Sequence, residues 1–226
     1  MSTPFLKLIQ QGATAEVADA VLADPALTVS RDPQGVSPLM WAVYFGQPLV
    51  RDLLLSRLEA YGIALDIFEA AATGGQTRLR TLLETEPGLA HSFSGDGWTP
   101  LHLAAAFGTP VSVSILLAAG AQIETFSKNP QHNQPLHAAL ALGKNTETIR
   151  LLLEHGAPAN ATQAGGFTPL FSAAIANRRD LVEMLLALGA DPHRKSDAGK
   201  TAADFARERG HVEMADWLES QPPTAV

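Results

Sequence analysis

The sequence predicts an all-α solenoid of about seven stacked helix-turn-helix units with projecting loops. A short motif recurs at steps of 35, 34 and 33 residues between Thr99 and Thr201. Alanine pairs and leucine pairs recur at matching places within each step. Of the 226 residues, 46% are hydrophobic and 17% are charged. This composition supplies a continuous apolar core, which a solenoid extends by adding units.

The recurring motif marks the start of the first helix in each unit. Its copies begin at Ser37, Thr99, Gln134, Thr168 and Thr201, and Pro-Leu follows in all but the last. A Ser or Thr hydroxyl at this place caps a helix, because it accepts a bond from a free backbone amide. Proline is tolerated at the first helical position, where its missing N–H leaves no bond unmade. We therefore expect a helix directly after each copy.

Each unit continues with a turn and a second helix. The first helix ends near a glycine that can adopt the left-handed conformation of a helix C-terminus; these are Gly46, Gly74, Gly108, Gly143 and Gly210. Paired alanines such as Ala104-Ala105 let neighbouring helices approach closely. The second helix carries a leucine pair that fills the groove to the next unit, and we expect Leu116 and Leu117 to be buried.

The N-terminal part repeats as a two-unit block. Residues 5–22 resemble residues 68–83, and an acidic residue and a proline follow each segment, at Asp24-Pro25 and Glu86-Pro87. The step of 62 residues from Ser37 to Thr99 leaves room for one degenerate unit, which lacks the motif and in which we expect an irregular turn. One extra residue is expected around Lys144 to Thr146.

These units form one predicted domain over residues 1–226. The predicted repeats are 4–31, 32–62, 63–93, 94–129, 130–162, 163–195 and 196–220, and residues 221–226 form a frayed tail. A solenoid needs terminal units with a polar outer face. Asp204, Arg207 and Glu219 replace small or apolar residues in the last unit, which predicts a C-terminal cap.

One segment carries a specific family resemblance. Residues 97–108 read Gly-Trp-Thr-Pro-Leu-His-Leu-Ala-Ala-Ala-Phe-Gly, and this matches the ankyrin repeat pattern at every defined position. The chain resembles the ankyrin repeat family from about Pro4 to Ser220, and its acid-Pro closures look similar to those of bacterial ankyrin proteins. The departures are Met40 and Phe171 at the histidine position, and Gln134 and His132 at the Thr and turn Gly positions. The resemblance implies antiparallel helix pairs whose concave face grips partner proteins.

No residue pattern predicts catalysis, a cofactor or a bound metal. The chain has no cysteine, which excludes disulfides, thiolate metal sites and a Cys nucleophile. No two histidines lie four apart beside a Glu, as zinc hydrolases require. The resemblance implies that His102 and His137 bond the cap hydroxyl and a neighbouring loop backbone. Gly199-Lys200-Thr201 lacks the first glycine of a phosphate-binding loop, since Arg194 stands there.

The candidate binding residues are aromatic. Positions at loop tips and at the ends of inner helices point toward the concave surface in this family, and large aromatic rings there can anchor an interface. The alternative is that some of these rings pack on a neighbouring loop. Trp41 and Trp217 are expected in the core. The candidates are Tyr44, Phe45, Trp98, Phe107 and Phe167.

The function class follows from fold and charge. The net charge of -7 comes from scattered acidic residues, which argues against nucleic acid as a partner. No apolar run approaches the ~20 residues of a membrane span, and no signal peptide is recognised, so we expect a cytoplasmic monomer. The leading hypothesis is a module that binds a partner protein. The alternatives are a metabolite or metal sensor or enzyme built on the solenoid, and an exported effector acting on a host protein.

Overall fold

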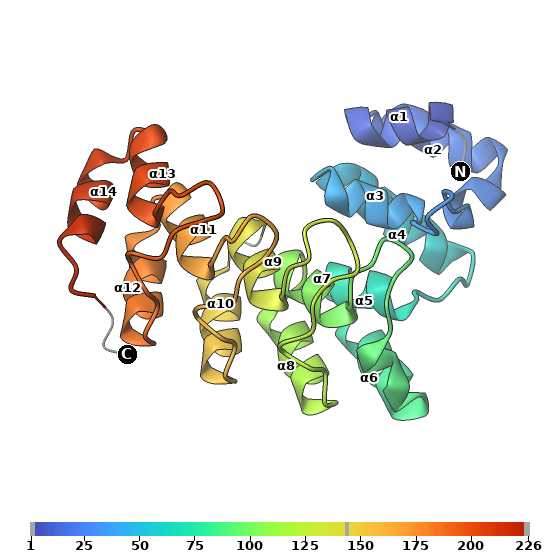
Figure 1. Cartoon of the computed structure of the whole chain (residues 1–226). Coiled ribbons are helices and arrows are strands. Elements are labelled where there is room, and N and C mark those ends of the chain that lie inside the picture. The colour runs from blue at the N-terminus through green and yellow to red at the C-terminus, as the bar shows by residue number, and fades with distance from the viewer. Residues whose placement is uncertain (1–2, 143–144, 224–226) are drawn as a thin grey trace.

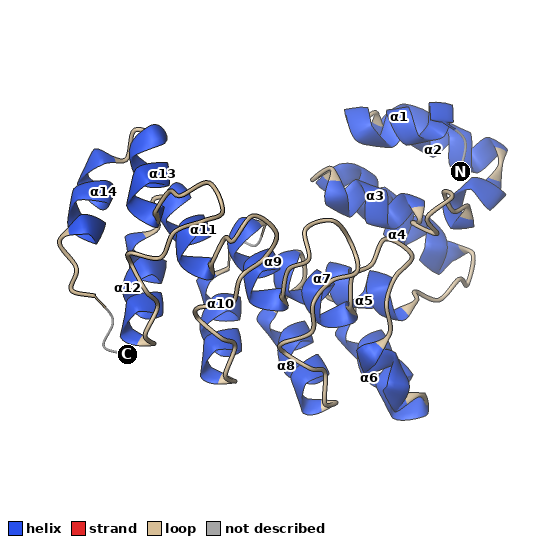
Figure 2. Ribbon diagram, viewed as in Figure 1, coloured by secondary structure: helices blue, strands red, loops and turns tan. Residues whose placement is uncertain are grey.

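The computed structural model describes residues 3–142 and 145–223 of the chain. Within these ranges the backbone forms α-helices, two short 3-10 helices and one isolated bridge between Gln163 and Phe167, with no longer strand (Figure 2). None of the described helices is long and apolar enough to cross a membrane. The expected helix end at Gly143 and the extra residue near Lys144 lie outside the described ranges.

Seven antiparallel helix pairs follow one another along the described chain, which confirms the predicted solenoid. The inner helices are α1 (Thr3–Gln11), α3 (Pro38–Tyr44), α5 (Ile67–Thr73), α7 (Pro100–Ala106), α9 (Pro135–Ala141), α11 (Pro169–Ile175) and α13 (Ala202–Glu208). The outer helices are α2 (Thr14–Ala23), α4 (Pro48–Ala60), α6 (Gln76–Thr85), α8 (Pro110–Ala118), α10 (Thr146–Glu154), α12 (Arg179–Ala187) and α14 (Val212–Glu219). The 3-10 helices Pro25–Val29 and Pro87–His91 follow the two acid-Pro pairs.

The stack is curved. Each inner helix packs on the next, and α1–α3 and α13 rise at the two ends around α7 and α9 (Figure 1). Fully buried alanines such as Ala71 and Ala104 allow this close packing. Gly46, Gly74 and Gly210 have the expected left-handed backbone, but Gly108 does not. A Cβ at Gly108 would overlap the carbonyl oxygen of Ala71, so helix approach is what requires glycine there.

Four inner helices, α3, α5, α7 and α13, begin at side-chain caps, whereas the Thr168 side chain makes no cap bond at the start of α11. The Ser37 and Thr99 hydroxyls accept bonds from amides three residues later, at 3.2 and 3.3 Å. The irregular turn expected in the third unit is wrong for the start of α5. There the Asp66 carboxylate accepts from the Glu69 amide (2.8 Å) and the Glu69 carboxylate accepts from the Asp66 amide (3.0 Å). This reciprocal capping box replaces the hydroxyl and the proline.

Projecting loops precede α3, α7, α9, α11 and α13. Backbone bonds join neighbouring loops in the last four units: the amides of Lys128, Ala164 and Asp197 donate to the carbonyls of Gly97, Gln131 and Gly165 at 2.8, 3.0 and 3.0 Å. The third unit has no such loop, because only residues 61–66 connect α4 to α5. The loop of the second unit therefore meets the loop of the fourth directly, where Gly95 lies against the carbonyl of Gln34.

Packing corrects two expectations about burial. Leu116 is fully buried but Leu117 is only half-buried, because the two leucines lie about 100° apart around α8. Trp217 packs against the core yet stays partly exposed, with the Arg179 guanidinium 3.9 Å from its ring centroid.

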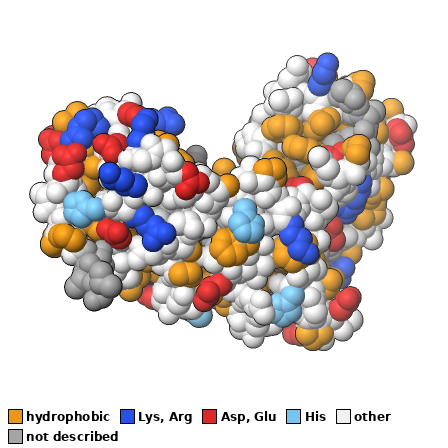
Figure 3. All heavy atoms as spheres, viewed as in Figure 1, with side chains coloured by type: hydrophobic (Ala, Val, Ile, Leu, Met, Phe, Trp, Pro, Cys, Tyr) orange, Lys and Arg blue, Asp and Glu red, His pale blue; other side chains and the backbone are white. Residues whose placement is uncertain are grey.

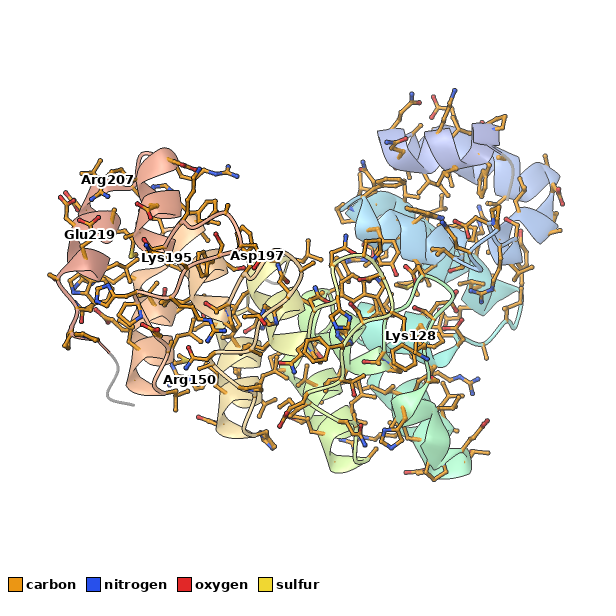
Figure 4. The ribbon with its side chains drawn as sticks, viewed as in Figure 1. Lys128, Arg150, Lys195, Asp197, Arg207 and Glu219 are labelled. Carbon is orange, nitrogen blue, oxygen red and sulfur yellow. The ribbon has the colours of Figure 1, made fainter. Side chains whose placement is uncertain are left out.

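The last unit has the polar outer face expected of a cap. Arg207 bonds Glu219 and Asp216 there, at 2.7 Å each, and Arg207 and Glu219 lie together at the outer edge (Figure 4).

Candidate functional site

An aromatic groove lies between the inner helices of the second and fourth units and the loops beside them. Its volume is about 480 Å³. The molecule is hollowed on this side, between its N-terminal and C-terminal units (Figure 3). Three of the five predicted aromatic residues line this groove, which we call the aromatic groove. It is lined by Gln34, Trp41, Tyr44, Gly95, Asp96, Trp98, Phe107, Lys128, Asn129, Pro130, Gln131 and Leu142.

The rings of the aromatic groove rest on a small hydrophobic cluster separate from the main core, and we call the rings and this cluster beneath them the groove floor. Val36, Met40, Ala72 and Leu103 are its buried members, and the groove rings pack against them. These four residues come from the second, third and fourth units. The groove is therefore set by how three units stack.

Tyr44 holds one side of the groove in place. It ends α3, and its hydroxyl donates to Asp96 Oδ2 on the loop of the fourth unit at 2.7 Å. Its ring lies 5.5 Å from that of Phe107. Burial raises the pKa of Tyr44 well above its usual value, and the Asp96 carboxylate raises it further. Tyr44 thus stays a neutral donor that links the second unit to the fourth across the missing third loop.

Trp41 is a groove residue that the sequence analysis assigned to the core. It lies one helical turn before Tyr44, on the same face of α3. Its indole donates to Asp32 Oδ2 at 3.0 Å, and its ring is half-buried. The three-residue spacing from Tyr44 was the signal that could have placed it here.

Phe45 and Phe167 are not among the groove residues. Phe45 stacks on Trp41 with ring centroids 5.2 Å apart and packs against the N-terminal core cluster. Phe167 contacts Phe171 and Phe205, at 5.2 and 5.1 Å between centroids, and so joins the sixth unit to the seventh. Phe45 and Phe167 therefore pack against neighbouring residues and do not line the groove.

The rim of the groove is polar. Gln34, Asn129 and Gln131 stand on the loops, and Lys128 lies on the loop before α9 (Figure 4). The Lys128 ammonium sits 3.9 Å from the Phe93 ring centroid. An apolar floor with a polar rim is the usual anatomy of a protein interface.

The buried histidines connect loops to helices. His102 Nε2 faces the carbonyl oxygen of Asn133 at 2.9 Å, so this nitrogen carries the hydrogen, and Nδ1 lies 2.7 Å from the Thr99 hydroxyl. His137 Nε2 lies 3.1 Å from the carbonyl oxygen of Ala161, but its Nδ1 accepts from the backbone amide of Gln134 at 3.4 Å, because this cap residue has no hydroxyl. Burial lowers the pKa of His102 to about 4 and also lowers that of His137. Both expected contacts are confirmed for His102, whereas for His137 only the contact with the loop backbone is confirmed and the expected hydroxyl partner is wrong.

The described residues hold no cluster of three or more His, Cys, Asp or Glu side chains with the geometry of a metal site. Neither His102 nor His137 is among the groove-lining residues, although the His102 ring packs against Trp98 with centroids 5.5 Å apart.

Comparison with known proteins identifies the family. The model of a family described as ankyrin repeats (3 copies) matches residues 67–163 and 123–196, more than half of the chain. The chain belongs to the ankyrin repeat family. Ankyrin repeats are generic modules of protein–protein interaction.

Relatives with known names contain the repeats within much larger proteins. The chain is 36% identical over 146 residues to a transient receptor potential cation channel subfamily A member 1 homolog of Caenorhabditis elegans (64% of this chain, 12% of that protein). It is 34% identical over 167 residues to human neurogenic locus notch homolog protein 4 (72% and 7%). It is 33% identical over 147 residues to the human mitochondrial disaggregase (65% and 19%). The chain therefore spans a small part of the length of each of these relatives.

Proposed function

We propose that this ankyrin repeat chain is a non-catalytic module that holds an extended segment of a partner protein in the aromatic groove. The supporting observation is the gathering of Trp41, Tyr44, Trp98 and Phe107 into one groove of about 480 Å³. Tryptophan and tyrosine dominate interface hot spots, because they bury a large area while losing little conformational entropy.

The groove suits an extended segment with one large apolar side chain. Leu142 is half-exposed at one wall, and Trp98 stands at the loop tip of the fourth unit. The amide side chains of Gln34, Asn129 and Gln131 offer donors and acceptors to a peptide backbone. An apolar anchor on the floor with amide contacts along the rim would hold such a segment.

The test is selection of peptides from a displayed random library against the intact chain. We expect selected peptides to share a large apolar residue. Trp98→Ala should weaken their binding by about 2 kcal/mol or more, roughly thirtyfold in Kd. Leu142→Asp should also weaken binding, with no loss of fold because the side chain is half-exposed.

The matched control is Phe126→Ala. Phe126 is an exposed aromatic residue that stacks on His132 outside the aromatic groove, with centroids 4.5 Å apart. This variant should bind the selected peptides as the parent chain does. Peptides that bind Trp98→Ala and Leu142→Asp unchanged would place the recognition surface elsewhere, and the proposal would be wrong.

A further inference from the structure

A second cavity lies beside the aromatic groove, at the place where the third unit has no projecting loop. Its volume is about 310 Å³, within the lower range of small-molecule sites, roughly 300–1,000 Å³. The loops of the second and fourth units meet over it, where a Cβ at Gly95 would overlap the carbonyl oxygen of Gln34. We call this space the junction cavity.

One part of the wall of the junction cavity is apolar, and the rest is polar. Val36 and Met40 come from the second unit, Phe68 and Phe93 from the third, and Leu103 from the fourth. Three of these side chains are buried in the cluster that also forms the groove floor. These walls suit the apolar part of a ligand.

The polar groups of the junction cavity are not balanced in charge. Arg31 donates to Asp66 at 3.0 Å and lies 3.7 Å from Glu69, so its positive charge is already shared by two carboxylates. Asp96 accepts the hydroxyls of Tyr44 and Ser94, at 2.7 and 2.6 Å. In the ion pairs of residues 3–142 and 145–223, Asp96 has no cationic partner within 4.0 Å.

Asp96 therefore keeps capacity to bind a cation. A carboxylate offers about four acceptor positions, and the two hydroxyls occupy two of them. Hydroxyl donors stabilise the carboxylate without neutralising its charge. Asp96 lies in the same wall as Met40, Phe68 and Phe93, so its charge faces a space that these hydrophobic side chains also line.

We propose that the junction cavity binds a small organic cation, a protonated amine attached to an apolar group. The ammonium would donate to the free acceptor positions of Asp96, and the apolar group would contact Met40, Phe68 and Phe93. An anionic ligand is disfavoured, because Arg31 already forms ion pairs with Asp66 and Glu69. This inference stands apart from the peptide groove, although Tyr44 and Asp96 form part of both sites.

Titration calorimetry of the full chain with phenethylamine tests the proposal, with phenethyl alcohol as the neutral probe of nearly the same shape. We expect saturable binding of the amine at least about tenfold tighter than that of the alcohol, since hydrogen bonds to a charged group are the stronger ones. Asp96→Asn removes the charge but keeps an oxygen that can accept the Tyr44 hydroxyl. This variant should lose the preference for the amine.

Controls separate the cavity from nonspecific attraction and from the groove. Asp52→Asn, at an exposed carboxylate of α4, should leave amine binding unchanged. Trp98 lines only the aromatic groove of the two sites, so Trp98→Ala should lose peptide binding while retaining amine binding. Equal binding of amine and alcohol, a preference that survives Asp96→Asn, or no saturable binding at millimolar amine would each overturn the proposal. None of these results bears on the peptide groove.

Discussion

Acid should destabilise this fold through the buried imidazole of His102. Its ring is fully buried, and each nitrogen has a partner suited to the neutral form. Burial lowers its pKa from 6.5 to about 4. The unfolded chain therefore binds a proton in this interval that the folded chain does not, and the free energy of unfolding falls as the pH is lowered.

The size of the effect follows from the two pKa values. Stability from this group is fully present above the unfolded value of 6.5 and is lost as the pH falls toward the folded value of about 4. Each unit of pKa difference corresponds to about 1.4 kcal/mol, so the loss reaches about 3 kcal/mol at the lower limit. His137 adds a loss of the same sign, because burial lowers its pKa too.

Urea unfolding followed by circular dichroism, repeated at several pH values between 6.5 and 4, measures this loss. The comparison chain is His102→Gln, whose amide does not titrate and can still bond both neighbours. Over the same pH interval, the unfolding free energy of this variant should fall by about 3 kcal/mol less than that of the parent chain. Glu69, whose pKa burial raises, acts in the opposite direction but is present in both chains and cancels. Parallel pH profiles for the two proteins would refute the argument.

Three further outcomes follow from packing. Leu116→Ala should cost about 2–5 kcal/mol of unfolding free energy in denaturant melts, more than Leu117→Ala, because only Leu116 is fully buried; equal costs would contradict this placement of α8. Gly108→Ala should lower the melting temperature more than Gly120→Ala, although Gly120 has the positive φ. Of these two positions, a Cβ would collide with backbone at Gly108 and would meet open space at Gly120. The reverse order would show that close helix approach is not the constraint at Gly108. Tyr44→Phe should weaken the joint between units two and four, detected as faster amide exchange in residues 94–98, since it removes the 2.7 Å bond to Asp96; unchanged exchange would show that the bond does not hold this loop.

The periodic features were predictable from the sequence because each depends on local geometry. A Ser or Thr hydroxyl before a helix can accept a bond from an amide three residues later, and Ser37 and Thr99 do so here, although Thr168 does not. Alanine at matching places in each step allows close helix packing, so the seven units could be counted from their spacing. The contacts of His102 and the loop contact of His137 followed from the family pattern.

Local pattern reasoning failed where the spatial neighbour came from another unit, as at Gly108, and where a unit did not use the repeated motif, as at Asp66. Gly108 fits the sequence signature of a left-handed helix end, yet the backbone of α5 decides its identity. Asp66 and Glu69 do not match the repeated motif, yet they cap α5 through a reciprocal capping box. Phe45 looks equivalent to its neighbour Tyr44, but the turn of the helix sends the two rings to different clusters.

The sequence by itself determined the helix pairs, their number and their order, since these depend on contacts within or between adjacent units. Only the tertiary structure decided which aromatic rings share a groove and where a cavity opens. The bond between Tyr44 and Asp96 joins residues 52 apart, and it forms because a connection of six residues, 61–66, omits the third loop. Loop length alone does not set the curvature that brings these units together, because curvature is the sum of small rotations at each interface along the stack.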